Sequence, residues 1–183
     1  MTPEIDAVSN PDFIAGLTDR PMAELRDMRT RSQAIENSLS YVRRLIQGRL
    51  DIVGAELARR HDGGAAGDSR DLISRLPDVL SDGSRSTGSA GSVRPPQPMD
   101  PKPAVVDALQ TRLDTVIDSE SVGNVSGLDG ERLSAALREL QAFEDEVSDT
   151  RKGLHTTIDV LQAEVTRRYR EGEVSVDALL SQG

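Results

Sequence analysis

The sequence predicts an all-α fold: a long antiparallel two-helix coiled-coil hairpin with short accessory helices and a disordered linker. Three observations support this prediction. Aromatic residues make up only 2% of the 183 residues and Trp is absent, which leaves little bulk for a broad core. Two proline-free stretches, each of roughly forty residues, are rich in good helix formers. A segment rich in Gly, Ser and Pro separates these two stretches.

The N-terminal third of the chain is predicted to contain an arm and a long helix. Residues 1–20 are expected to form a flexible N-terminal arm with at most one helical turn, because they contain two prolines, a glycine and one short apolar patch. Residues 21–62 are expected to form the first long helix. Pro21 suits a first helical turn, where its missing N–H group is not needed, and Asp62 with the two glycines after it marks the end.

The rest of the chain is predicted to contain a linker, two helices and a tail. Residues 63–102 have the composition of a low-complexity linker. Apolar residues within the stretch 70–80 leave two alternatives open, a disordered tether or a docking segment that becomes ordered on a partner. Residues 103–172 are expected to form a short helix and a second long helix, and residues 173–183 a C-terminal tail.

Composition also argues against several classes of function. The chain has no Cys and two isolated His residues, so disulfides and thiolate metal sites are excluded and no metal site is predicted. A net charge of −9 argues against direct DNA binding and favours basic proteins as partners. Neither a secretion signal nor an apolar stretch of membrane-spanning length is visible, so we expect a cytoplasmic protein that has no membrane partner.

The two long helices carry the same pattern of polar residues. Shifting the second helix back by 108 positions, so that Glu144 falls on Glu36, aligns it with the first without a gap. At about 100° per residue, each set of five residues lies within an arc of about 80° along about 22 Å of helix. We call each set a polar ridge. The ridges comprise Glu36, Ser40, Arg43, Gln47 and Asp51 in the first helix and Glu144, Ser148, Arg151, His155 and Asp159 in the second.

An apolar stripe accompanies each ridge. It is offset by one residue and is spaced mostly by four and three residues, as in a coiled-coil seam. If the helices pack antiparallel through equivalent stripes, a local two-fold axis brings both ridges out on the same side. The stripes comprise Ile35, Leu39, Val42, Ile46, Leu50, Val53 and Leu57 in the first helix and Phe143, Val147, Thr150, Leu154, Ile158, Leu161 and Val165 in the second.

The paired ridges suit a two-fold symmetric nucleotide. Arginine can bind the O6 and N7 acceptors of guanine with two hydrogen bonds, and a carboxylate can accept from the guanine N–H groups. Hydroxyl, amide and imidazole groups suit phosphate and ribose oxygens. The serines have no positioned base and the sequence has no Gly-rich phosphate loop, so we expect binding rather than catalysis.

The pattern E-x3-S-x2-R-x3-Q-x3-D resembles the signature of the RsiG family, the cyclic di-GMP-binding anti-sigma factors of filamentous actinobacteria. The match is complete in residues 36–51, and in residues 144–159 only His155 replaces Gln. The resemblance implies that the ten ridge residues bind cyclic di-GMP as an intercalated dimer. It further implies that the loaded protein holds a sporulation sigma factor of the WhiG type away from RNA polymerase. Because imidazole is shorter than the Gln side chain and can carry a charge, His155 raises the question of whether the half-sites bind equivalently.

Simpler interpretations compete with this one. The ridges could be solvated helix faces, or they could mediate homodimerisation of a coiled-coil scaffold that needs no nucleotide. Glu36 and Glu144 could contact the ligand or could pair with Ser or Arg residues of their own helices. The Arg59–Arg60 and Arg167–Arg168 pairs are expected to interact with the carbonyl groups at the C-terminal ends of the helices.

Overall fold

The computed structural model describes residues 1–61 and 101–172, and within these ranges all regular elements are helical. The predictions for residues 63–100, for the stretch 70–80 within them and for residues 173–183 lie outside the described residues. The all-α prediction is confirmed. In chain order the elements are α1 (Pro3–Ser9), η1 (Pro11–Ile14), η2 (Leu17–Asp19), α2 (Met22–His61), α4 (Pro103–Val116), α5 (Ser119–Gly123), η3 (Val125–Gly127) and α6 (Gly130–Arg170).

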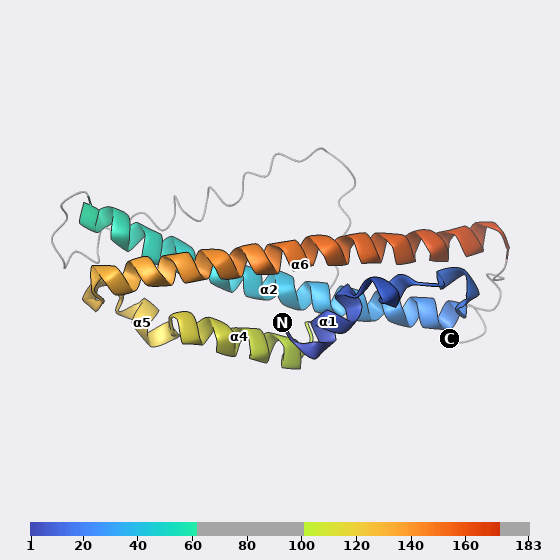
Figure 1. Ribbon diagram of the computed structural model, residues 1–183, viewed down its shortest axis with the longest axis horizontal. Helices are drawn as coiled ribbons and strands as arrows, with labels where there is room; N and C mark the ends of the chain where they lie inside the picture. Colours follow the sequence, from blue (N-terminus) through green and yellow to red (C-terminus); the bar gives the residue numbers. More distant parts are fainter. Residues whose placement is uncertain (62–100, 173–183) are drawn as a thin grey trace.

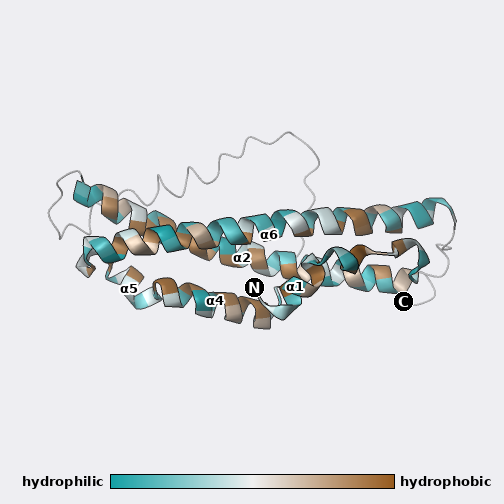
Figure 2. Cartoon of the chain, viewed as in Figure 1, coloured by the Kyte–Doolittle hydropathy of each residue, from teal (hydrophilic) through white to brown (hydrophobic). Residues whose placement is uncertain are grey.

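The two long helices, α2 and α6, lie side by side and run in opposite directions (Figure 1). Arg29, near the start of α2, donates a hydrogen bond to Gln162, near the end of α6. The predicted stripes meet in the interface, where Leu39, Ile46 and Leu154 are fully buried. Apolar and polar residues alternate along both helices in Figure 2, as expected for helices that bury one side. The antiparallel hairpin of the prediction is therefore confirmed.

The start of α6 has a clear local cause. The side chain of Asp129 precedes the helix and accepts a hydrogen bond of 2.7 Å from the backbone N–H of Arg132, one of the groups without a partner in the first turn. Both long helices end with basic residues, which interact favourably with the negative end of the helix dipole.

The shorter helix α4 packs against one side of the hairpin. The backbone N–H of Lys102, which precedes α4, donates to the hydroxyl of Ser38 on α2 at 2.8 Å. From the same helix, Arg112 pairs with Glu146 on α6 at 2.6 Å and stacks over the ring of Phe143. Ser38 and Glu146 lie about 180° around their helices from the polar ridges. The ridges are therefore on the face of the hairpin opposite to α4.

The structure of the N-terminal segment differs from the expected flexible arm. Residues 3–9 form α1, whose Ile5 and Val8 are buried in the same core as the apolar stripes. The side chain of Asn10 then caps η1 by accepting a hydrogen bond of 2.9 Å from the backbone N–H of Asp12. The physical reason is tertiary: two apolar residues three positions apart are too few to predict a helix, but they bury completely against a hairpin that is already apolar there.

Candidate ligand-binding groove

The first half of the site combines residues from both long helices. The Nε atom of Arg43 on α2 donates to Glu144 Oε1 at 2.7 Å and to the Ser148 hydroxyl at 2.8 Å, both on α6. Gln47 follows Arg43 one turn later and donates to the same carboxylate oxygen at 3.3 Å. The Ser148 hydroxyl also donates to Glu144 at 3.0 Å. One carboxylate of α6 therefore gathers two donors from α2 and one from its own helix.

The second half repeats this arrangement with the helices exchanged. Arg151 on α6 donates through Nε to Glu36 Oε1 on α2 at 3.1 Å, and the Ser40 hydroxyl donates to the same oxygen at 2.7 Å. His155 takes the place of Gln47: its Nε2 lies 3.4 Å from Glu36 Oε1 and 3.3 Å from Nη2 of Arg151. The eight residues thus form two half-sites related by a local two-fold axis, as the antiparallel packing predicts.

The ion pairs correct one expectation about the glutamates. The pairing considered from sequence was with Ser40 or Arg43 of the same helix, or with the equivalent residues of α6. The structure retains the Ser partner in each helix, whereas the Arg partner of each Glu comes from the opposite helix. The sequence could not reveal this exchange because it depends on the antiparallel register. Each ion pair therefore joins the two helices rather than supporting one of them.

Exposure divides the site into a floor and a rim. The side chains of Glu36 and Glu144 are only 8% and 12% exposed, whereas those of Arg43 and Arg151 are 33% and 25% exposed. The His155 side chain is the most open of the contacting groups, at 53%. The carboxylates therefore lie deep between the helices and orient the guanidinium groups. The guanidinium groups remain accessible to a molecule that lies on this face.

The structure does not bring Asp51 and Asp159 into this network. Both are exposed, and none of the described hydrogen bonds or ion pairs involves their side chains. Because the helices are antiparallel, the two aspartates extend from the centre of the network in opposite directions. A rise of 1.5 Å per residue places them about 30 Å apart along the groove. They mark its two ends.

A second duplicated cluster, which we call a clamp, lies beyond each end of the network. In the first clamp, the buried carboxylate of Glu56 accepts from Arg59 at 2.7 Å and from Arg60 at 2.6 Å. Arg60 also donates to the backbone carbonyls of Ser126 at 3.1 Å and Leu128 at 2.7 Å. This clamp fixes the turn that precedes α6 onto the end of α2.

The second clamp makes equivalent contacts at the other end of the hairpin. Glu164 accepts from Arg167 at 2.9 Å and from Arg168 at 2.8 Å. Arg168 then donates to the carbonyls of Leu17 at 2.6 Å and Arg20 at 2.7 Å, which precede α2. The Arg pairs were expected to interact with carbonyls at the ends of their own helices. Instead, in these bonds one Arg of each pair reaches the carbonyls that precede the opposite long helix.

The clamps also shift the acidity of their carboxyl groups. Hydrogen bonds from Arg59 lower the pKa of Glu56, and burial of the carboxyl group acts in the opposite direction. With the further hydrogen bond from Arg60, the pKa falls to about 2. Hydrogen bonds from Arg167 and Arg168 lower the pKa of Glu164 to about 2. The pattern E-x2-R-R recurs in both helices at the same offset as the ridges and was visible in the sequence, but its target carbonyls were not.

The duplication therefore includes the turns before the long helices. The carbonyls that Arg60 and Arg168 contact before α6 and α2 occupy equivalent positions in the two copies.

Among the described helices, none is long and apolar enough to cross a membrane.

A comparison with known families agrees with this internal symmetry. A family model described as RsiG-like matches residues 11–80 and 119–182, and the two matched segments begin at equivalent positions of the duplication. No curated protein sequence matches the chain. Because the two matched segments together cover more than half of the sequence, the chain belongs to the RsiG-like family.

Proposed function

We propose that this protein is a cyclic di-GMP-dependent anti-sigma factor that sequesters a WhiG-type sporulation sigma factor from RNA polymerase in the cytoplasm. The observation that carries the proposal is the pair of half-sites on one face of the hairpin, in each of which Glu and Ser of one helix meet Arg of the other. Membership in the RsiG-like family supports the same conclusion. The groove is open, and its carboxylates are already engaged by arginines of the opposite helix, so the proposed activity is binding.

The donor set fits a ligand with two guanines and two phosphates. The guanidinium groups of Arg43 and Arg151 could each bind the O6 and N7 atoms of one guanine, and their planes could stack on the bases. Ser and Gln or His side chains beside them suit phosphate and ribose oxygens. Asp51 and Asp159, at the ends of the groove, could accept from guanine N–H groups. Cyclic di-GMP, as a dimer, would then contact both helices at once.

Sigma factor binding would depend on the nucleotide because the hairpin and the bound nucleotide together would form the surface that the sigma factor contacts. A ligand on the open face of the hairpin adds contacts for a partner that neither helix offers alone. The net charge of −9 favours basic regions of the sigma factor as the parts that bind. Thermodynamic linkage requires that the sigma factor strengthen nucleotide binding by the same factor by which the nucleotide strengthens sigma factor binding.

A thermal melt and a capture assay test this proposal together. Cyclic di-GMP should raise the melting temperature of the full chain, and GMP at the same concentration should not. The immobilised protein should retain a WhiG-type sigma factor in the presence of cyclic di-GMP and release it after the nucleotide is washed away. Absence of a melting shift would contradict nucleotide binding, whereas equal capture with and without the nucleotide would contradict its regulatory role.

A second candidate is a constitutive coiled-coil scaffold or homodimerisation module. The observation in its favour is that the four central charged groups already satisfy one another across the helices. Such pairs can fix the register of a hairpin without any ligand. This function predicts the same melting temperature with cyclic di-GMP and GMP, so the melt described above separates the two candidates.

A further inference from the structure

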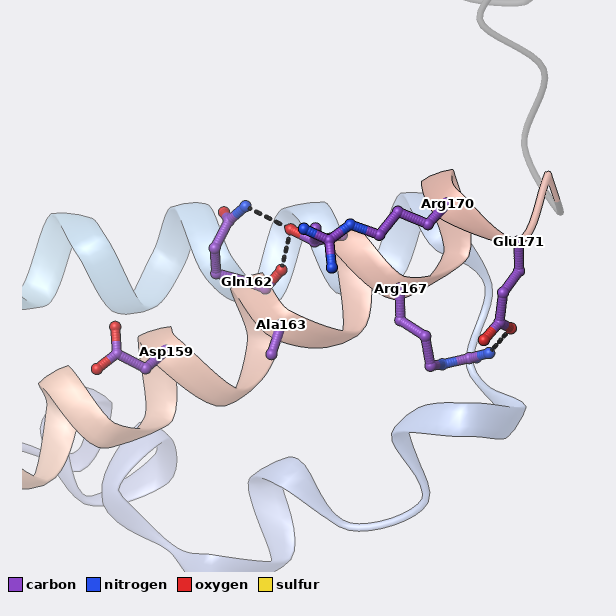
Figure 3. Close-up of a pocket in the computed structure, with 7 residues that line it drawn as sticks. Asp159, Gln162, Ala163, Arg167, Arg170 and Glu171 are labelled. Carbon is purple, nitrogen blue, oxygen red and sulfur yellow. Dashed lines mark hydrogen bonds and ion pairs between the residues drawn. The ribbon is translucent and has the colours of Figure 1, made fainter.

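Beyond the ten ridge residues, the ridge surface continues toward the start of α2 and the end of α6. Arg29 lies seven residues before Glu36 and therefore on the same face of α2. On α6, Gln162 and Thr166 follow within about 20° of the middle of the ridge, and Arg170 lies about 60° from it. Figure 3 shows Gln162 and Arg170 on this side of α6. Both residues line an open hollow of about 520 Å³.

This end of the groove holds three arginines without carboxylate partners among the described residues. Arg29 donates to the Gln162 amide oxygen at 2.5 Å, and Arg26 donates to the hydroxyl of Tyr169 and stacks 5.7 Å from the centre of its ring. Arg170 is exposed. We call Arg26, Arg29 and Arg170 the cationic end. Of the acidic residues that line the hollow, Glu171 is paired with Arg167, and Asp159 lies at the edge nearer the network.

The opposite end of the groove lacks the equivalent arginines and polar residues. At the equivalent positions of the duplication, Arg29 is replaced by Leu137, Gln162 by Gly54 and Thr166 by Ala58. A Cβ atom added at Gly54 would have no neighbour within 4 Å, so no side chain fills the space beside this position. Arg26 corresponds to Ser134, and Arg170 corresponds to Asp62, which lies outside the described residues. The two copies agree at four of five ridge positions and diverge in charge immediately beyond them.

This asymmetry has a consequence for any protein that covers the groove. Two nearly identical half-sites offer a partner two orientations of similar energy, related by the local two-fold axis. The half-sites differ only by His155 in place of Gln47, whereas the ends of the groove differ in charge and can distinguish the two orientations. Guanidinium groups with free donors bind carboxylates through paired hydrogen bonds. An extended polyanion such as nucleic acid would also meet the net charge of −9, whereas a short acidic segment contacts only the local cluster.

We propose that the cationic end is a docking surface for an acidic segment of the protein partner, and that it fixes the direction in which the partner lies along the groove. The proposal rests on the proposed function in one respect, that a protein partner covers the groove face. Docking of the acidic segment requires no nucleotide, so an experiment can contradict the docking surface without contradicting nucleotide binding, and the reverse.

A binding assay with an acidic peptide tests the docking surface. The probe is a fluorescent peptide of alternating Glu and Gly residues, and the same peptide with Gln in place of Glu is the reference. The full chain should bind the Glu peptide at low salt and should not bind the Gln peptide. The variant Arg29→Leu with Arg170→Ala should weaken binding about tenfold or more, since two charge-assisted contacts are lost.

The matched control removes two exposed arginines elsewhere, Arg44→Ala with Arg138→Ala, and so changes the net charge equally. It should bind the Glu peptide within about twofold of the original chain, because exposed charges at a distance are screened. Equal weakening in both double variants, or no binding by the original chain, would overturn the proposal. Displacement of the peptide by an equal concentration of inorganic phosphate would also overturn it, by assigning the site to phosphate. A cyclic di-GMP melting shift retained in Arg29→Leu with Arg170→Ala shows that this outcome concerns docking and not nucleotide binding.

Discussion

The molecule contains two kinds of duplicated Glu–Arg cluster, and their arginines have different partners. In the clamps, one Arg of each pair divides its donors between a carboxylate and backbone carbonyls that precede the opposite long helix. In the groove, the hydrogen bonds of Arg43 and Arg151 within the described part of the chain all go to side chains, and both arginines stay partly exposed.

Backbone carbonyls of a turn cannot turn away from a donor, whereas side chains on an open face can exchange partners with a ligand. An ionic cluster that only stabilises the fold should therefore leave its cations few donors for a ligand, whereas a binding cluster should leave them accessible. Substitutions in the clamps should have the largest effect on stability.

Breaking a clamp should cost the most stability. Arg168→Met leaves Glu164 with one cation and removes the donor from the carbonyls of Leu17 and Arg20, all in a largely buried setting. We expect the free energy of unfolding to fall by about 3 kcal/mol in urea denaturation. The control Arg170→Met changes an exposed neighbour and should stay within about 0.5 kcal/mol of the original chain. A loss below about 1 kcal/mol in Arg168→Met would mean that the clamp is not structural.

The clamps should also make the fold sensitive to acid. The pKa values of Glu56 and Glu164 are lowered to about 2 in the folded protein, so these groups stay ionised where the unfolded chain already takes up protons. Their stabilising contribution is complete above 4.5, the ordinary pKa of a glutamate side chain, and is lost as the pH falls toward 2. The urea midpoint should therefore fall steeply over this range.

The matched control for the acid effect is Glu56→Gln with Glu164→Gln. This variant should be less stable at neutral pH but should show a shallower fall of the urea midpoint below pH 4.5. The same slope in both proteins would assign the acid sensitivity to other groups.

Removing a groove arginine should cost less stability than breaking a clamp. Arg43→Ala and Arg151→Ala should each lower the free energy of unfolding by about 1 kcal/mol, because their ion pairs are partly solvated and each Glu keeps its Ser partner. Chemical denaturation of both variants beside Arg168→Met provides the comparison. Should the groove variants lose as much stability as the clamp variant, the groove would be a structural cluster and the scaffold would be favoured.

The smallest effect is expected from making the half-sites alike. His155→Gln gives both halves the same five residues and should strengthen cyclic di-GMP binding by about two- to fivefold, the contribution of one hydrogen bond. The reverse variant, Gln47→His, should weaken cyclic di-GMP binding by a similar factor. Calorimetric titration of both variants measures these changes. Unchanged affinity in both variants would mean that this pair of positions does not influence the ligand.

Much of this architecture could be predicted from the sequence because the two long helices repeat the same pattern of polar and apolar residues. The phase of the apolar stripes predicted the seam, and the antiparallel arrangement predicted that both ridges share a face, as the contacts of Arg43 and Arg151 show. What the sequence did not reveal depends on tertiary register. Glu36 is paired with Arg151 of the other helix, and Arg60 with carbonyls far along the chain. Helix α1 could not be predicted because its two buried residues need the hairpin beneath them.

The central claim is that Arg43 and Arg151 bind cyclic di-GMP from opposite helices. The most direct test is calorimetric titration of cyclic di-GMP into the original chain, Arg43→Ala, Arg151→Ala and the control Arg44→Ala, whose arginine is exposed and about 100° around α2 from Arg43. We expect binding by the original chain and by Arg44→Ala, and loss of binding in both other variants. Affinity equal to that of the original chain in Arg43→Ala and Arg151→Ala would contradict the account.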